Sequence, residues 1–270
     1  MEACIPSMKL RKATSMKLII LGSGTCLPST SRHPAGYLLD TGAELLLIDC
    51  GDGTLNQIAH AGYDPMQITT ILISHGHLDH FAGLFALLMS YMVAGRTNPL
   101  SILCPPDLHA KLLTLLATLD TCGTSMETSW LGTHYQRIID PLEPGNSEQP
   151  FGKLTVMQLV HADLIAYGYR IEVKDKAIVY SGDTEYCPAL ISLCKKADAA
   201  ILDCSFPNGT EANGHLTPGL AGMAATEAKA KHLILSHIYP ETDRHDLNAE
   251  TQTSFIGKIT VARDLLSITV

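Results

Sequence analysis

Three histidines and one aspartate lie within a short stretch of the sequence, Ser74-His75-Gly76-His77-Leu78-Asp79-His80. The stretch directly follows an apolar run that predicts a buried strand over residues 69–74. Neutral imidazoles and carboxylates are the ligands that Zn²⁺ takes in catalytic sites. In an extended turn, alternate side chains point the same way, so we expect His75 and His77 to serve one metal ion, and Asp79 and His80 a neighbouring one. A solvated histidine-rich turn is disfavoured, because polar groups packed after a buried strand would cost stability.

Four further residues lie next to predicted elements and are candidates to complete two sites. His161 follows a strand predicted over 153–160, Asp183 follows one over 177–181, and His237 follows one over 232–236. His215 precedes a helix predicted to begin with Thr217 as N-cap and proline in its first turn. Taken singly, each is more often a core or surface residue than a ligand. The repeated pattern of an apolar strand that ends in His or Asp favours one shared site.

Strands and helices alternate in both halves of the chain. The remaining strands are expected over 17–21, 37–40, 44–49, 100–104, 166–172 and 199–204, and helices over 54–61, 81–94, 105–119, 187–195, 217–230 and 247–255. Residues 121–150 are expected to be irregular, and residues 1–15 to form a loose leader. No linker divides the rest, so we predict one domain over 16–270, an α/β fold with two sheets face to face and helices outside.

Composition limits the classes of function. The chain has 270 residues, 46% of them hydrophobic, with a formal net charge of −8. Its basic cluster, Lys9, Arg11, Lys12 and Lys17, is interpreted as part of a solvated N-terminal end. Binding of extended nucleic acid is not expected, because phosphate contacts need clustered Lys and Arg.

The cysteines and the apolar runs bear on the cellular compartment. The eight cysteines include no C-x-x-C pair and are expected to be reduced, mostly buried thiols. The longest apolar run, residues 81–94, is too short to span a bilayer. We therefore predict a cytoplasmic protein with no membrane partner.

At this point the sequence resembles the metallo-β-lactamase fold superfamily, and within it the ribonuclease Z-like, phosphodiesterase-like branch. The matching segments are Leu21-Gly22-Ser23-Gly24, Ile48-Asp49-Cys50-Gly51, the H-x-H-x-D-H at 75–80, His161, Ser181-Gly182-Asp183-Thr184, Gly214-His215-Leu216-Thr217-Pro218 and Leu235-Ser236-His237. They extend over nearly the whole chain. The resemblance implies a four-layer αββα sandwich and a metal-dependent hydrolase.

The resemblance also implies how the ligands are shared between two divalent metal ions. His75, His77 and His161 would hold the first ion, Asp79, His80 and His237 the second, and Asp183 would bridge both. Zn²⁺ suits these ligands, with Mn²⁺ or Fe²⁺ as alternatives. Asp49 would hydrogen-bond a ligand or its loop. The alternative for Asp49 is a plain turn residue before Gly51.

Such a site predicts hydrolysis by a hydroxide shared between two metal ions, with Asp79 and Asp49 as part of the catalytic machinery. His215 is the candidate to donate a proton to the leaving alkoxide or to hold the phosphate. The alternative for His215 is a residue of the capping loop.

The substrate is expected to be a phosphodiester of a small molecule or short nucleotide. Ribonuclease Z has a long arm that grips transfer RNA between the positions matching His161 and Asp183, and here that interval holds only two predicted strands. Transfer-RNA 3′ endonuclease activity and a lactonase or other ester hydrolase remain the alternatives, and a non-catalytic metal-binding protein is disfavoured. A homodimer is an expectation from the resemblance alone.

Overall fold

The computed structural model describes residues 15–120 and 138–270 and contains two seven-stranded sheets. The first has the order β14 (Ser267–Thr269), β1 (Lys17–Gly22), β2 (Gly36–Asp40), β3 (Leu45–Cys50), β4 (Ile68–Leu72), β5 (Ser101–Cys104) and β6 (Ile139–Pro141). The second has the order β13 (Lys258–Val261), β12 (His232–Ser236), β11 (Ala199–Asp203), β10 (Lys176–Tyr180), β9 (Leu164–Val173), β8 (Gly152–His161) and β7 (Gly145–Gln149). Both sheets are mixed, with parallel pairs over β3–β6 and over β10–β13.

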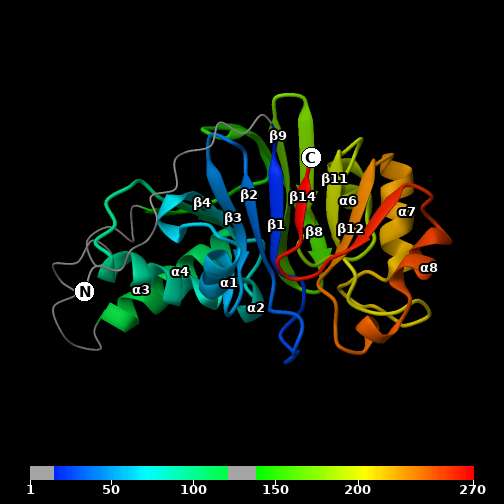
Figure 1. Cartoon of the computed structure of the whole chain (residues 1–270), viewed down its shortest axis with the longest axis horizontal. Coiled ribbons are helices and arrows are strands. Elements are labelled where there is room, and N and C mark those ends of the chain that lie inside the picture. The colour runs from blue at the N-terminus through cyan, green and yellow to red at the C-terminus, as the bar shows by residue number, and fades with distance from the viewer. Residues whose placement is uncertain (1–14, 121–137) are drawn as a thin grey trace.

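Helices cover the outer face of each sheet (Figure 1). The first sheet carries α1 (Thr54–His60), α2 (Leu78–Phe81), α3 (Gly83–Val93) and α4 (Pro106–Asp120), with the short 3₁₀ helix η1 (Pro65–Gln67). The second carries α6 (Pro188–Leu193), α7 (Pro218–Ala228) and α8 (Leu247–Gln252), with η3 (Thr242–Arg244). None of the helices in the described ranges is long and apolar enough to cross a membrane.

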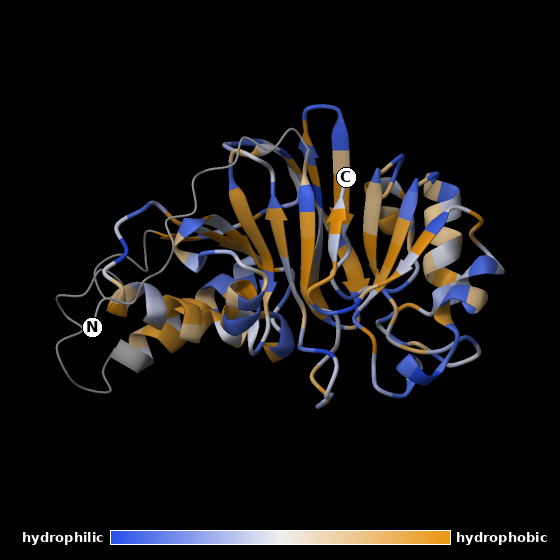
Figure 2. Ribbon diagram, viewed as in Figure 1, coloured by the Kyte–Doolittle hydropathy of each residue, from blue (hydrophilic) through white to orange (hydrophobic). Residues whose placement is uncertain are grey.

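Three clusters of buried apolar side chains hold the four layers together. In β1, Leu18 and Ile20 point into the cluster between the sheets, while Ile19 and Leu21 point into the cluster beneath the helices. The third cluster lies between the second sheet and α6–α8. Because both faces of each sheet are covered, central strands such as β3 and β11 are buried throughout and apolar up to the aspartate near their carboxyl ends. The hydropathy colouring shows the strands as mainly apolar (Figure 2). The four-layer αββα sandwich is therefore confirmed.

One edge of the sandwich collects the carboxyl ends of several strands. β3 and β4 run parallel in one sheet, and β10, β11 and β12 run parallel in the other. β8 points the same way as β10, since each is antiparallel to β9. Loops after parallel strands therefore converge at this edge, which is where open α/β sheets bind ligands.

The structure differs from the sequence predictions in three regions. The expected helix over 81–94 starts earlier and is divided at Ala82 into α2 and α3. Residues 139–149 were expected to be irregular but include β6 and β7, and β13 and β14 were not predicted. Most of the irregular segment, residues 121–137, and most of the leader, residues 1–14, lie outside the described residues. Of the six cysteines described, all are free and five are buried.

Candidate metal centre

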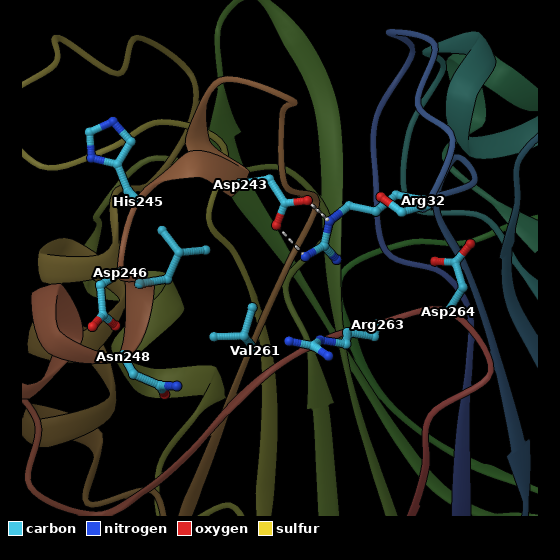
Figure 3. A pocket seen from close by; sticks show the side chains of 10 residues that line it. Arg32, Asp243, His245, Asp246, Asn248, Val261, Arg263 and Asp264 are labelled. Atoms are coloured by element: carbon cyan, nitrogen blue, oxygen red, sulfur yellow. Dashed lines mark hydrogen bonds and ion pairs between the residues drawn. The ribbon is translucent and has the colours of Figure 1, made fainter.

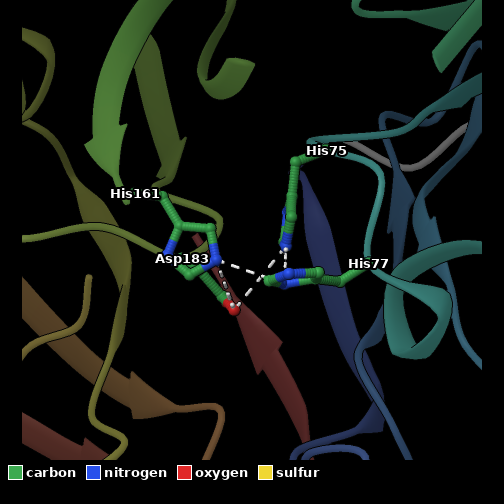
Figure 4. A group of neighbouring side chains, drawn as sticks. All are labelled: His75, His77, His161 and Asp183. Atoms are coloured by element: carbon green, nitrogen blue, oxygen red, sulfur yellow. Dashed lines mark hydrogen bonds and ion pairs between the residues drawn. The ribbon is translucent and has the colours of Figure 1, made fainter. Parts of the chain in front are cut away.

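Four predicted ligands meet in a first group at this edge (Figure 4). His77 Nδ1 lies 3.0 Å from His75 Nε2 and 3.2 Å from His161 Nε2. The Oδ2 atom of Asp183 lies 3.7 Å from His75 Nε2 and 3.8 Å from His161 Nε2. Four potential ligand atoms from three separate segments of the chain thus face one point.

A second group adjoins the first and shares Asp183 with it. His80 Nε2 lies 3.3 Å from His237 Nε2, and Asp79 Oδ2 lies 3.5 Å from the same His237 atom. Asp183 Oδ1 is 3.4 Å from His80 Nε2, and Asp183 Oδ2 is 3.5 Å from His237 Nε2. The seven residues predicted as ligands are therefore all brought together, in two sets with Asp183 between them.

The spacing of these atoms fits divalent metal ions. With a metal–nitrogen distance of about 2.0–2.1 Å, neighbouring ligands of a tetrahedral site lie about 3.3–3.4 Å apart. The separations within the first group, 3.0 to 3.8 Å, straddle that value. Asp183 is only 2% exposed, and its Oδ1 has no hydrogen-bond donor among the described residues. Because a buried carboxylate oxygen without a partner is costly, a cation at this point would satisfy it.

The second ring nitrogen of each buried imidazole is held by another group. His161 Nδ1 donates to the carbonyl oxygen of Gly214 at 2.6 Å, and His80 Nδ1 to Asp49 Oδ2 at 2.7 Å. These two bonds leave Nε2 of each ring without a proton in the neutral form and available to a metal. His237 Nδ1 lies 2.9 Å from the hydroxyl of Ser205, which orients that ring in the same way.

Electrostatics at the centre favour positive charge. Burial lowers the pKa of His75 and His77, which keeps both imidazoles neutral, as ligands must be. Burial also opposes charge on His80, but the carboxylates of Asp183 and Asp49 outweigh it and raise the His80 pKa well above its usual value. Burial alone would raise the pKa of Asp183, yet His237 and His80 bring it well below the usual range. The negative charges of the Asp183 and Asp49 carboxylates thus favour the binding of a cation at the centre.

Asp49 is the hub of a buried network, which corrects its alternative reading as a plain turn residue. Its side chain accepts from the Ser74 backbone N–H at 2.7 Å and from the Ser74 hydroxyl at 2.8 Å, besides His80. Tyr180 donates its hydroxyl to Asp49 Oδ2 at 2.5 Å. Asp49 therefore ties the segment that follows β4 to the end of β10.

Backbone conformation at the centre is specialised. Asp49 and His237 both have positive φ, 54° and 59°, which non-glycine residues seldom adopt. Gly182 has φ 59°, and a Cβ on it would lie 2.9 Å from Cβ of Ser74. Such outliers gather at functional sites, where the surrounding structure must hold them.

The sequence predicted one extended turn for the segment that carries His75, His77, Asp79 and His80. The structure contradicts this prediction, because the second part of the segment is helical. His77 is extended, with φ −79° and ψ 141°, and serves as the N-cap of α2, whereas Asp79 and His80 lie inside that helix. The helical turn, not strand-like alternation, directs Asp79 and His80 to the second group. The two residues of each expected pair nevertheless lie in the same group, His75 and His77 in the first and Asp79 and His80 in the second.

His215 lies beside the second group and pairs with an aspartate that the sequence reasoning missed. Its Nδ1 is 2.8 Å from Asp203 Oδ2, and its ring stacks on His237 with centroids 5.6 Å apart. Burial lowers the pKa of His215, but the hydrogen bond and charge of Asp203 outweigh burial and raise it to about 8. His215 also precedes α7, where Thr217 is the N-cap as predicted.

Asp203 could have been found from the same signal as the other candidates, whereas Ser205 carries no such signal. Asp203 ends the apolar strand β11, just as Asp183 follows β10. The Ser205 hydroxyl donates to Asp203 Oδ1 at 2.6 Å and contacts Nδ1 of His237. Ser205 thus connects the Asp203–His215 pair to a candidate ligand.

Comparison with known proteins agrees with this geometry. A model of the beta-lactamase superfamily domain matches residues 45–238. The chain is 30% identical to the "probable metallo-hydrolase YhfI" of Bacillus subtilis, over 92% of this chain and 97% of that protein. It is 29% identical to ribonuclease Z of Methanothermobacter thermautotrophicus, over 94% and 97%.

A solved structure also has this fold. The crystal structure of the metallo-beta-lactamase fold protein YhfI from Bacillus subtilis superposes with a TM-score of 0.79 at 24% identity, over 94% of this chain and 99% of that chain. With the family model covering most of the chain and relatives aligned along nearly its whole length, the chain belongs to the beta-lactamase superfamily, in which its ribonuclease Z-like relatives mark it as a metal-dependent hydrolase.

Proposed function

We propose that this protein hydrolyses phosphodiester bonds with the help of two divalent metal ions held at the edge of the sandwich. The observation that carries the proposal is the position of Asp183, which is buried between two sets of potential ligand atoms and has one carboxylate oxygen without a hydrogen bond. A carboxylate so placed can bridge two cations, and two-metal sites are typical of phosphoryl-transfer hydrolases.

Each residue of the centre has an assigned role in this proposal. His75, His77 and His161 would hold one ion, Asp79, His80 and His237 would hold the other, and Asp183 would be shared between them. Zn²⁺ is the metal that best suits the imidazole-rich set, with Mn²⁺ and Fe²⁺ as alternatives. Asp49 orients His80, and Ser205 orients His237.

When bound, the two ions would supply a nucleophile at neutral pH by lowering the pKa of a water to roughly 7, and would neutralise charge on the phosphoryl oxygens. The protein's own contribution is orientation. Gly214 O and Asp49 Oδ2 accept the Nδ1 protons of His161 and His80, so both rings present Nε2 to the centre. The buried, low-dielectric surroundings strengthen each of these interactions.

His215 is the group placed to serve the leaving oxygen. Asp203 holds its Nδ1 proton, so any proton transferred to substrate leaves from Nε2. Among the described residues, no hydrogen-bond partner occupies that Nε2. An Asp–His pair of this kind fixes the imidazole tautomer and stabilises the imidazolium form. We therefore assign His215 as proton donor or phosphate-holding group, and Asp203 as the residue that positions it.

The substrate is proposed to be a small or nucleotide-derived diester. Between His161 and Asp183 the chain forms only β9 and β10, so no arm protrudes from this interval to grip a transfer RNA. The net charge of −8 is also unfavourable for a long polyanion. The similarity to ribonuclease Z proteins keeps transfer-RNA 3′ cleavage as a second candidate, to be tested directly. We place the protein in the cytoplasm, in accord with its free cysteines.

A substrate panel tests this proposal. The metal-loaded protein should hydrolyse bis-(p-nitrophenyl) phosphate, and should process homoserine lactones and precursor transfer RNA far more slowly. Faster turnover of the lactone would show an ester hydrolase, and accurate 3′ cleavage of precursor transfer RNA would show the ribonuclease Z activity. No turnover of any ester with both metals bound would refute a catalytic role.

A further inference from the structure

A cavity of about 420 Å³ opens directly beside the metal centre. Asp79, a proposed ligand, forms part of its wall together with Leu78 and Ala82. The loop between β1 and β2 also lines it, with Leu27 and Pro28. The volume lies in the range of small-molecule sites, about 300–1,000 Å³. A substrate held at the metals through its phosphoryl group would extend one substituent into this cavity.

The walls of the cavity present apolar side chains to solvent. Leu27 is 50% exposed and Leu78 is 66% exposed, although neither is at a chain end. Exposed apolar side chains that gather at one hollow of the surface are typical of a ligand-binding groove. These two leucines come from segments far apart in the sequence, so the cavity is built by the fold.

The wall that carries Leu27 is anchored at its base. Asp264 accepts hydrogen bonds from the Ser23 backbone N–H at 2.9 Å and from the His33 backbone N–H at 2.7 Å. Arg32 forms a bidentate ion pair with Asp243, with Nε 3.0 Å from Oδ2 and Nη2 2.6 Å from Oδ1. Figure 3 shows this ion pair among the residues that line a neighbouring cavity. These bonds hold both ends of the loop in place.

The lining has no free cation among the described residues. Arg32 is committed to Asp243 and also donates from Nη1 to the Ser23 hydroxyl and to the Ala262 carbonyl oxygen. His33 pairs with Asp264. Asp52, in contrast, lines the cavity and makes no ion pair with any described residue. A second phosphate or a carboxylate would meet a negative charge here and no counter-charge.

A neighbouring cavity of about 680 Å³ is not a candidate to hold a substituent of a substrate bound at the metal centre. Its lining includes Arg32, Asp243, Arg263 and Asp264, but none of the seven candidate ligands (Figure 3). A substrate bound there would not have its phosphoryl group at the metal centre.

We propose that the cavity between Leu27 and Leu78 binds an uncharged, apolar substituent of the substrate, of the size of an aryl ring, while the phosphoryl group lies at the metals. The inference rests on the proposed function and narrows its substrate class to diesters with one such group. A polyphosphate or an anionic chain is excluded from this side of the centre.

Non-hydrolysable phosphinates test the inference by binding as well as by inhibition. Methyl(phenyl)phosphinate and dimethylphosphinate offer the same two oxygens to the metals and differ by one ring. Burial of the ring should make the phenyl compound the better competitor of bis-(p-nitrophenyl) phosphate hydrolysis by about tenfold or more. Its addition should also shift the ¹³C-methyl NMR signals of Leu27 and Leu78.

Two substitutions and a matched control locate the effect. Leu78→Ser and Leu27→Ser should each reduce the preference for the phenyl compound by about threefold or more, with metal content unchanged. Ile256→Ser removes a fully exposed apolar side chain that lines neither cavity, and should leave the preference as it is.

Equal affinity of the parent protein for the two phosphinates would overturn the inference while the proposed function stands. Tighter binding of carboxymethyl(methyl)phosphinate than of the phenyl compound would overturn it too. If no diester is hydrolysed and neither phosphinate binds the metal-loaded protein, the proposed function itself has failed, and the inference fails with it.

Discussion

Asp49 holds the imidazole of His80 through a 2.7 Å contact between Oδ2 and Nδ1, although the two residues belong to different elements. Asp49 lies in β3 at a φ of 54°, and His80 lies in α2. The same carboxylate also binds Ser74, just before the first ligand. One side chain therefore orients the second group and anchors the segment that delivers the first.

Replacement of Asp49 by Asn should weaken metal binding by about 10- to 100-fold, because a partner that orients a ligand contributes about that much to affinity. Competition with a chelator of known affinity would measure the change. Asp175→Asn is a matched control, since Asp175 is exposed in the turn between β9 and β10, at the opposite end of these strands. Equal affinities of the parent and Asp49→Asn proteins would contradict the role given to Asp49.

The Asp203–His215 pair should affect turnover and not metal loading. His215→Ala is expected to retain two metal ions per chain and to lower kcat by about 10²- to 10⁴-fold, the usual contribution of a general acid. Asp203→Asn should also lower kcat, because the amide no longer holds the Nδ1 proton of His215. Rates on an activated phosphodiester, measured beside metal content, decide this. Turnover at the parent rate in His215→Ala would remove His215 from the mechanism.

Stability should require glycine at position 182 for two reasons, its positive φ and the lack of space for a Cβ atom. Gly182→Ala introduces a Cβ 2.9 Å from that of Ser74 at a φ of 59°, so it should destabilise the protein and displace Asp183. Gly62→Ala is the control, because Gly62 has a φ of 79° with nothing within 4 Å of its Cβ position. The control should lose only the stability that corresponds to a left-handed backbone at a non-glycine residue, about 1–2 kcal/mol. Measurements of Tm and metal affinity for both variants test this prediction. Equal losses in Gly182→Ala and Gly62→Ala would contradict a steric clash between residue 182 and Ser74.

Metal removal should lower the stability of the parent protein and leave that of Asp183→Ala nearly unchanged. Binding at a hundred times Kd contributes about 2.7 kcal/mol, which for a chain of this size is roughly 5–10 °C in Tm. Differential scanning calorimetry with and without chelator would show the difference. A parent Tm that does not respond to chelator, or an Asp183→Ala Tm that falls as far, would oppose the assignment of Asp183 as the bridging ligand.

The sequence singled out the seven candidate ligands, which the structure brings together, because their signals are local. His75, His77, Asp79 and His80 form one short motif, and His161, Asp183 and His237 each follow an apolar strand. Parallel strands bring such ends to one edge without any knowledge of the pairing.

Other features depended on contacts that no local pattern encodes. The hydrogen bond of Asp203 to His215 joins β11 to the loop before α7, and Asp203 carries no mark in sequence beyond its place at a strand end. The break between α2 and α3 places Gly83 against the backbone of Gly51, where a Cβ would lie 2.1 Å from the Gly51 oxygen. The short strands β13 and β14 owe their structure to pairing with β12 and β1.

Metal titration of the metal-free protein tests the central claim most directly, with hydrolysis of bis-(p-nitrophenyl) phosphate followed at each addition of Zn²⁺. The proposed two-metal centre around Asp183 predicts that activity rises from background and levels off at two ions per chain. Activity that is independent of added metal, or no activity once two ions are bound, would contradict the account.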